Sequence, residues 1–149
     1  MKNPQTLAEK LYQQFPTIKL RMIKEYACCA FTLLWVLGKD KIDDGEAILL
    51  VCELIDNGCL DSDCTVYWDK VSRYVAHASC SVENKVINSI GKIRERTPVR
   101  YMYTDANGKK HGHWVGVEKG RIAFNSLEYS NCVAKGKPVE CRVLTFKEI

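Results

Sequence analysis

The sequence lacks the features that would mark a membrane-spanning or repeat protein. Its most apolar run, around residues 31–37, is far too short to cross a bilayer. No internal repeat and no low-complexity linker interrupts the 149 residues, a length that suits one domain with a sizeable core. We therefore expect a single globular domain over residues 1–149, with no membrane partner.

An excess of charge of one sign is also lacking. The chain carries 22 Lys and Arg against 18 Asp and Glu, a formal net charge of +4. The basic residues are scattered, and the densest cluster is the segment 91–100. Because nucleic-acid binding usually needs a concentrated basic surface, we expect no nucleic-acid partner.

Cysteine, in contrast, is abundant, with eight residues. The N-terminal segment MKNPQTLAEKLYQQF has no apolar signal-peptide core, and a chain of this length does not need disulfides to fold. Several cysteines, including Cys28, Cys29 and Cys52, lie in apolar helical patterns, where free thiols behave as small hydrophobes. We expect a reducing, cytoplasmic environment, while release or injection from the cell without a standard signal stays open.

Hydrophobic periodicity divides the chain into a helical part, about 1–90, and a β part, about 95–149. In the first part the patterns predict helices after Pro4, over residues 26–38, over residues 43–58 and over residues 69–78. In the second part, strands are predicted over residues 99–104, 113–119, 120–126 and 140–146, with a hairpin at Asn107-Gly108. Helices followed by an antiparallel sheet indicate the α+β class.

Three polar residues fall at positions that suit a thiol nucleophile. Cys28 begins the apolar helix, His113 begins a strand, and Asn125 ends the next strand. A helix N-terminus and a nearby imidazolium both favour the thiolate, and can lower a cysteine pKa from about 8.5 to roughly 3.5–7.5. A third group then orients the imidazole through its other ring nitrogen.

These segments resemble a known family. CCAFT, GHWVGV and FNS are similar to the nucleophile, catalytic-histidine and Asn-Ser elements of papain-like cysteine peptidases, in the same order. The chain's size is similar to compact bacterial and phage members, such as the bacteriocin-processing peptidase-like group, and the likeness spans about residues 24–126. The resemblance implies a papain-like fold and hydrolysis of a peptide, isopeptide or related amide bond, without a cofactor. It assigns Cys28 as nucleophile, His113 as general base and acid, and Asn125 as the orienting residue.

One element of the family pattern is absent. Papain-like enzymes have a Gln about six residues before the nucleophile as an oxyanion donor, whereas this chain has Met22 there and no Gln between Phe15 and Cys28. The Cys28 amide or the Tyr26 side chain could donate in its place. Since loss of one such donor typically costs 10²–10³ in rate, a weak enzyme or an inactive protein that binds a protein partner is the alternative.

The remaining reactive residues have simpler interpretations. A cysteine in an apolar helix can be merely packed, and Cys29 is expected to be inert because it matches a packing position of the family. His111 lies in a turn with two lysines and is expected to be solvated, and His77 is expected on a helix face.

A second alternative is a structural zinc site. Cys59, Cys64, His77 and Cys80 have the spacing Cys-x4-Cys-x12-His-x2-Cys, close to that of a zinc finger, with Trp68 and Tyr74 at core positions. The last spacing is shorter than usual, and eight cysteines produce chance spacings easily. We therefore expect no bound metal.

Overall fold

The computed structural model describes all 149 residues as six helices and a five-stranded antiparallel sheet, which confirms the α+β class. No helix combines the length and apolar character needed to cross a membrane. The helices are α1 (Pro4–Gln14), α2 (Ile18–Tyr26), α3 (Cys28–Val36), α4 (Asp44–Asp56), α5 (Trp68–Ala76) and α6 (Asn131–Lys135). The strands are β1 (Ala78–Val86), β2 (Thr97–Thr104), β3 (Lys110–Glu118), β4 (Arg121–Phe124) and β5 (Lys137–Glu148).

The predicted helix over residues 26–38 is wrong at its start. The structure ends α2 at Tyr26, breaks the helix at Ala27 (φ −85°, ψ 8°) and begins α3 at Cys28. The Lys24 carbonyl, which faces this break, accepts a hydrogen bond from the Gln5 side chain at 2.7 Å. This contact comes from a distant part of the chain, so the local apolar pattern could not indicate the break.

The boundary between the helical and β parts also lies earlier than predicted. The left-handed conformation of His77 (φ 53°) ends α5, and residues 78–86 then form β1. All nine residues of β1 pair with β5, from Ala78 opposite Glu148 to Val86 opposite Glu140. Strand β1 is stabilised by pairing with β5 at the other end of the chain. The local sequence pattern of residues 78–86 does not indicate this pairing.

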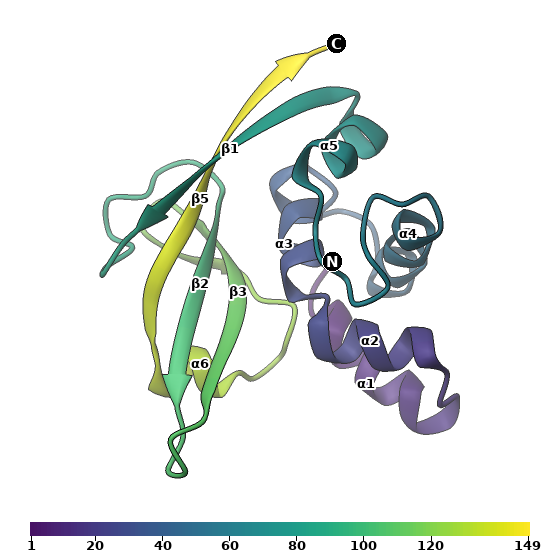
Figure 1. Cartoon of the computed structure of the whole chain (residues 1–149), viewed down its shortest axis with the longest axis horizontal. Helices are drawn as coiled ribbons and strands as arrows, with labels where there is room; N and C mark the ends of the chain where they lie inside the picture. The colour runs from purple at the N-terminus through teal and green to yellow at the C-terminus, as the bar shows by residue number, and fades with distance from the viewer.

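The sheet has the strand order β1-β5-β2-β3-β4, with the helical layer on one side (Figure 1). The β2–β3 hairpin predicted at Asn107-Gly108 is confirmed, and Gly108 has the positive φ of 79° that its turn requires. The short helix α6 packs against β2 and β3 through Cys132, which belongs to a small core with Val99 and Val115.

Helix α3 is the central element of the larger core. It is apolar on all sides, as the sequence predicts, and lies between the sheet and the other helices (Figure 1). Its Trp35 stacks on Phe124 with the ring centroids 6.1 Å apart. A Cβ on Gly116 would lie 2.5 Å from the Trp35 ring, so only glycine at this position of β3 lets the helix approach so closely. This contact fixes α3 against the strand that carries His113.

Candidate functional site

The start of α3 lies against an unpaired edge of β3. Strand β4 pairs with β3 only over residues 116–118, so β3 has no strand partner on that side at residues 112–114. There the buried Thr32 hydroxyl contacts the Trp114 carbonyl at 3.5 Å, while it donates its stronger hydrogen bond to the Cys28 carbonyl at 2.7 Å. The first turn of α3 therefore occupies the position that a neighbouring strand would otherwise take.

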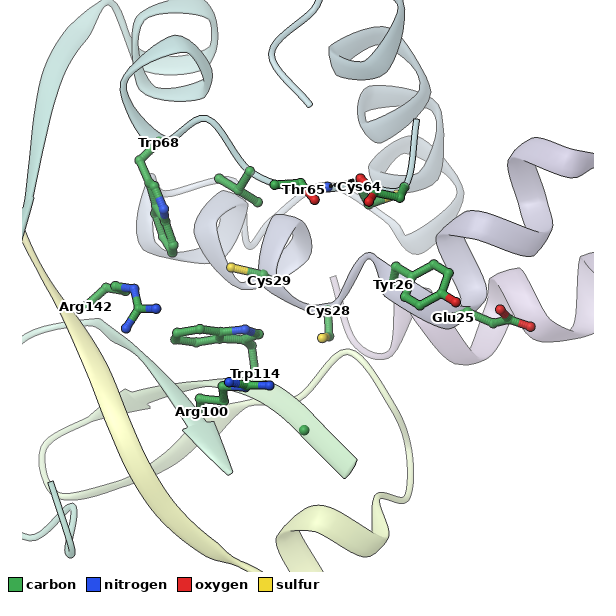
Figure 2. A pocket seen from close by; sticks show the side chains of 13 residues that line it. Glu25, Tyr26, Cys28, Cys29, Cys64, Thr65, Trp68, Arg100, Trp114 and Arg142 are labelled. Atoms are coloured by element: carbon green, nitrogen blue, oxygen red, sulfur yellow. Dashed lines mark hydrogen bonds between the residues drawn. The ribbon is translucent and has the colours of Figure 1, made fainter. Parts of the chain in front are cut away.

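The alternation of side chains along β3 gives Cys28 a cavity on each side. Successive strand residues point to opposite faces, so His113 and Trp114 lie on different sides of the strand. Cys28 lines both a cavity of about 320 Å³ that contains His113 and a cavity of about 450 Å³ that contains Trp114. Gly112, which has no side chain, also borders both. Figure 2 shows the larger cavity, with Cys28 at the junction of α2 and α3.

His113, which lines the smaller cavity, pairs with Asn125, as their order in the sequence predicts. His113 Nε2 lies 2.7 Å from Asn125 Oδ1, and the Leu127 backbone N–H also donates to Oδ1 at 3.0 Å. Because this oxygen can only accept, the hydrogen on His113 must be on Nε2. In the neutral imidazole Nδ1 is then an unprotonated acceptor, the form that a general base needs.

Helix α1 holds the loop that carries Asn125. Asn3 Nδ2 donates to the Asn125 carbonyl at 3.0 Å, and the Gln5 backbone N–H donates to the Ser126 carbonyl at 2.9 Å. The fully buried Ser126 hydroxyl donates to Gln5 Oε1 at 2.7 Å. The first turn of the chain thus fixes the position of Asn125, 120 residues away in the sequence.

Gln5 is a site residue that the sequence analysis missed. Its side chain is almost fully buried and lines the cavity shared by Cys28 and His113. Nε2 donates one hydrogen to the Lys24 carbonyl, and a primary amide carries a second. In the family pattern the glutamine lies shortly before the nucleophile, whereas Gln5 is 23 residues before Cys28. Only the packing of α1 beside the α2–α3 junction brings Gln5 here.

The predicted lowering of the Cys28 pKa is wrong. Burial raises the pKa of this thiol above its ordinary value, although the backbone amides of Trp114, Cys29 and Cys28 itself oppose the shift. Burial also lowers the pKa of His113, with the Asn125 hydrogen bond acting in the opposite direction. The structure contains no hydrogen bond between Cys28 and His113, and burial favours the uncharged form of each side chain by its effect on the pKa.

Cys29 differs from Cys28 in its surroundings. It lines only the larger cavity, where its sulfur points toward the side on which Trp68 and Trp114 lie (Figure 2). Burial raises the pKa of the Cys29 thiol well above its ordinary value, and the neighbouring Cys28 adds to this rise. All eight cysteines are free thiols, and burial raises the pKa of each of them.

The two other histidines are held away from Cys28 or engaged elsewhere. His111 borders the smaller cavity, where its Nε2 contacts Asp105 Oδ2 at 2.9 Å and its ring stacks on Tyr103. It is thus half-buried and paired, although the sequence analysis expected a solvated side chain. His77 is exposed at the end of α5.

The zinc-like spacing does not produce a cluster. Cys59 and Cys64 lie in the connection between α4 and α5, whereas Cys80 lies in β1. Nowhere in the chain do three or more His, Cys, Asp or Glu side chains come together in an arrangement that could hold a metal ion. Trp68 packs edge to face on Trp114, and Tyr74 is exposed, so the two do not form the core of a finger.

The larger cavity has a basic end that the sequence analysis did not find. Arg100 in β2 pairs directly opposite Trp114 and next to Glu140 in β5, which places all three on one face of the sheet. Arg142, two residues further along β5, stacks on the Trp114 ring at 4.8 Å. Both guanidinium groups favour the thiolate of Cys29, although burial outweighs them. The strand register, rather than any local motif, brings these arginines beside Cys28 and Cys29.

The site therefore combines a buried thiol, an oriented imidazole and an amide donor around one cavity, with two arginines in the adjoining one. A thiol that can transfer its proton to a nearby base is the minimum needed for nucleophilic attack on a carbonyl carbon. Comparison of the chain with protein-family models, curated proteins and solved structures found no match.

Proposed function

We propose that the protein is a thiol-dependent hydrolase of the papain-like type, which cleaves a peptide, isopeptide or related amide bond. The observation that carries this proposal is the 2.7 Å hydrogen bond between His113 and Asn125 beside the cavity that Cys28 lines. The bond leaves His113 Nδ1 unprotonated, and Cys28 and His113 both line one open cavity of about 320 Å³. The papain-like fold itself is part of the proposal. It is supported by the packing of the buried helix α3 on an antiparallel sheet.

The reaction follows from these groups. His113 Nδ1 takes the thiol proton as the Cys28 sulfur attacks the substrate carbonyl carbon, so that a C–S bond forms and the carbonyl electrons move to oxygen. The imidazolium then gives its proton to the leaving nitrogen as the C–N bond breaks, which leaves a thioester. Water attacks the thioester with His113 as base again, and a carboxylic acid leaves as the thiol is restored.

Two donors could stabilise the oxyanion. The break at Ala27 makes Cys28 the first residue of α3, and the first amide groups of a helix have no acceptor within it. Gln5 lines the same cavity, and its second amide hydrogen is not needed for the bond to Lys24. We assign these two groups to the role that the family gives to the Cys amide and a Gln. Gln5 thus takes the place of the glutamine that is absent near Met22.

The neutral resting pair makes His113 a base rather than one half of a preformed ion pair. The pKa of Cys28 lies above, and that of His113 below, the ordinary value of each. At pH values between these two pKa values, the Cys28 thiol keeps its proton until a substrate is bound. Proton transfer to His113 then accompanies the attack of the sulfur. Reaction at Cys28 therefore depends on transfer of the thiol proton to His113.

Paired substitutions test the proposal. We expect iodoacetamide to label Cys28 faster than the other seven thiols, and His113→Ala to remove this difference. Turnover of a peptide-amide mixture should be lost in Cys28→Ala and in His113→Ala but kept in Cys29→Ala and His111→Ala. Cys29→Ala is the control for Cys28→Ala, and His111→Ala is the control for His113→Ala, because each changes a nearby residue of the same type. Turnover that survives both Cys28→Ala and His113→Ala would defeat the assignment.

The alternative is an inactive relative that binds a protein partner. It is favoured by the raised pKa of Cys28 and by the lack of a hydrogen bond to His113. In that case Cys28→Ala would keep the full biological effect, and substitutions around the two cavities would remove it. The predicted cytoplasmic location and the peptide or protein substrate remain predictions from the sequence.

A further inference from the structure

The arginine end of the larger cavity has more hydrogen-bond donors than the protein uses. Each guanidinium carries five N–H groups. Arg142 makes two long contacts, 3.3 Å to Glu140 Oε1 and 3.5 Å to the Cys141 carbonyl, although its side chain is only 16% exposed. Arg100 has a single ion pair, to the same Glu140 oxygen at 3.6 Å. Two cations therefore share one carboxylate, and most of their donors have no acceptor in the protein.

The acidic residues of the cavity do not neutralise these arginines. Glu25 is paired with Lys24 at 3.4 Å and lies at the opposite end of the cavity from Arg142 in Figure 2. Asp63 accepts a hydrogen bond from the Thr65 backbone N–H at 3.1 Å. The cavity is consequently divided into an end next to Glu25 and a positively charged end next to Trp114.

The walls of the basic end suit a short aliphatic chain that ends in an anion. Trp68 and Trp114 meet edge to face with their centroids 6.3 Å apart and give this end apolar sides. Arg142 is held in place by its stacking on Trp114. Arg100 lies directly over Gly112, since a Cβ there would come within 2.7 Å of its Nη2, and Gly112 also borders the cavity of His113. A group held by Arg100 would thus be next to the reacting thiol.

We propose that this cavity binds a carboxylate of the substrate, with Arg100 and Arg142 as its ligands. The inference rests on the proposed hydrolase function and names its substrate class: an acidic peptide, in which a carboxylate lies close to the bond attacked by Cys28. The planar guanidinium geometry matches a carboxylate, and the apolar walls fit the methylene groups of a glutamate side chain better than a bare inorganic ion.

Three N-acetylated peptides of nearly equal size test the inference on full-length Cys28→Ala, a substitution that prevents turnover. They are acetyl-Gly-Glu-Gly-amide, acetyl-Gly-Gln-Gly-amide and acetyl-Gly-Gln-Gly with a free C-terminal carboxylate. The chain has only three tryptophans, so the indole N–H signals in a ¹⁵N spectrum report directly on the site. Trp68 and Trp114 should shift on titration, while Trp35, which is buried against Phe124, serves as the internal control.

We expect the glutamate peptide to bind roughly tenfold more tightly than the glutamine amide, the scale of a charge-assisted hydrogen bond. The free-acid peptide distinguishes a terminal carboxylate from a side-chain one. Arg142→Gln and Arg100→Gln should each reduce the preference, and the double variant should remove it. Arg142→Lys should keep part of it, because the charge remains but the paired donors are lost. The control Arg73→Gln, at an exposed ion pair with Asp69 on α5, should leave it unchanged.

Equal affinity for all three peptides, or a preference that persists in the double arginine variant, would overturn the inference. The outcome is separable from that of the proposed function. A carboxylate preference without any Cys28-dependent turnover would retain the binding site and reject the hydrolase. Turnover without a carboxylate preference would do the reverse.

Discussion

The two cavities that meet at Cys28 differ in how their polar groups are satisfied. Around His113, the hydrogen bonds are made inside the protein, through Asn125, Ser126 and Gln5. Around Trp114, two arginines share one glutamate and retain most of their donors. The internal hydrogen bonds hold His113, Asn125 and Gln5 in one geometry, whereas the many spare donors of the arginines are available to a ligand. The first arrangement is suited to chemistry and the second to recognition.

A single strand produces both arrangements. Because β3 alternates its side chains, His113 and Trp114 necessarily face different cavities. A slip of the β2–β3 register by one residue would exchange the two faces. The confirmed hairpin turn at Gly108 sets this register, and so couples the geometry of the base to that of the arginines.

The largest effect is expected from a substitution of Gln5 in the cavity that His113 lines. Gln5→Glu keeps the size of the side chain but replaces both amide hydrogens by an acceptor, which would face the developing oxyanion. We expect kcat/KM to fall by about 10²–10³, the usual cost of losing one oxyanion donor. The measurement is steady-state turnover, corrected for the folded fraction, because the loss of the Lys24 contact also destabilises the fold by about 1–3 kcal/mol.

Gln13→Glu is the matched control, since Gln13 is an exposed residue on the same helix. It should leave kcat/KM nearly unchanged. A Gln5→Glu enzyme as active as the wild type would show that the cavity stabilises the oxyanion without this side chain.

Gly116→Ala should disrupt both cavities together, because it acts on the contact between α3 and β3. The added methyl would lie 2.5 Å from the Trp35 ring, so the helix or the strand must move. We expect a loss of about 1–3 kcal/mol in the free energy of unfolding, measured by urea denaturation. Gly91→Ala, where a Cβ meets nothing within 4 Å, should change it by less than about 0.5 kcal/mol. Equal stability of the two variants would contradict a tight contact at Trp35.

The features of the two cavities and of the fold that the sequence predicted are those that depend on local sequence. Helix α4, the hairpin at Gly108 and the order of Cys28, His113 and Asn125 follow from caps, turn residues and short motifs. The parts it did not predict depend on distant segments. Gln5 reaches the site because α1 packs beside the junction of α2 and α3, where its side chain donates to the Lys24 carbonyl next to the break at Ala27. The pairing of β2 with β3 and β5 brings the two arginines together.

The prediction of a lowered Cys28 pKa was wrong for a related reason. A helix N-terminus favours a thiolate, but burial opposes it by raising the thiol pKa, and the extent of burial depends on how completely the rest of the fold covers Cys28. Sequence position alone gives the first effect and not the second. The family resemblance already distinguished Cys28, as nucleophile, from Cys29, as a packing residue. The structure adds that Cys28 lines both cavities and Cys29 only the larger one.

A smaller effect is expected on acid stability, and it sharpens the description of His113. Burial holds the pKa of His113 in the folded protein below its ordinary value of 6.5. Below pH 6.5 the unfolded chain therefore binds more protons than the folded one, and the free energy of unfolding should decrease as the pH falls toward the folded-state pKa. His113→Gln should remove this contribution, so its denaturation midpoints should change less between pH 7 and 5. Parallel curves for the two proteins would mean that the imidazole is not buried in its neutral form.

The smallest effect is expected from Cys29→Ala, which tests the difference between adjacent thiols. Cys29 lines only the larger cavity and not the one that contains His113, so His113 is not placed to take its proton. Burial also raises the pKa of the Cys29 thiol well above its ordinary value. We expect turnover to remain within about twofold of the wild type and the unfolding free energy to fall by about 1 kcal/mol, since only one partly buried sulfur is removed. The variant leaves Arg100 and Arg142 in place, so the carboxylate preference should also remain. A large loss of turnover in Cys29→Ala, with Cys28→Ala still active, would transfer the nucleophile to Cys29 and with it the chemistry to the arginine-lined side.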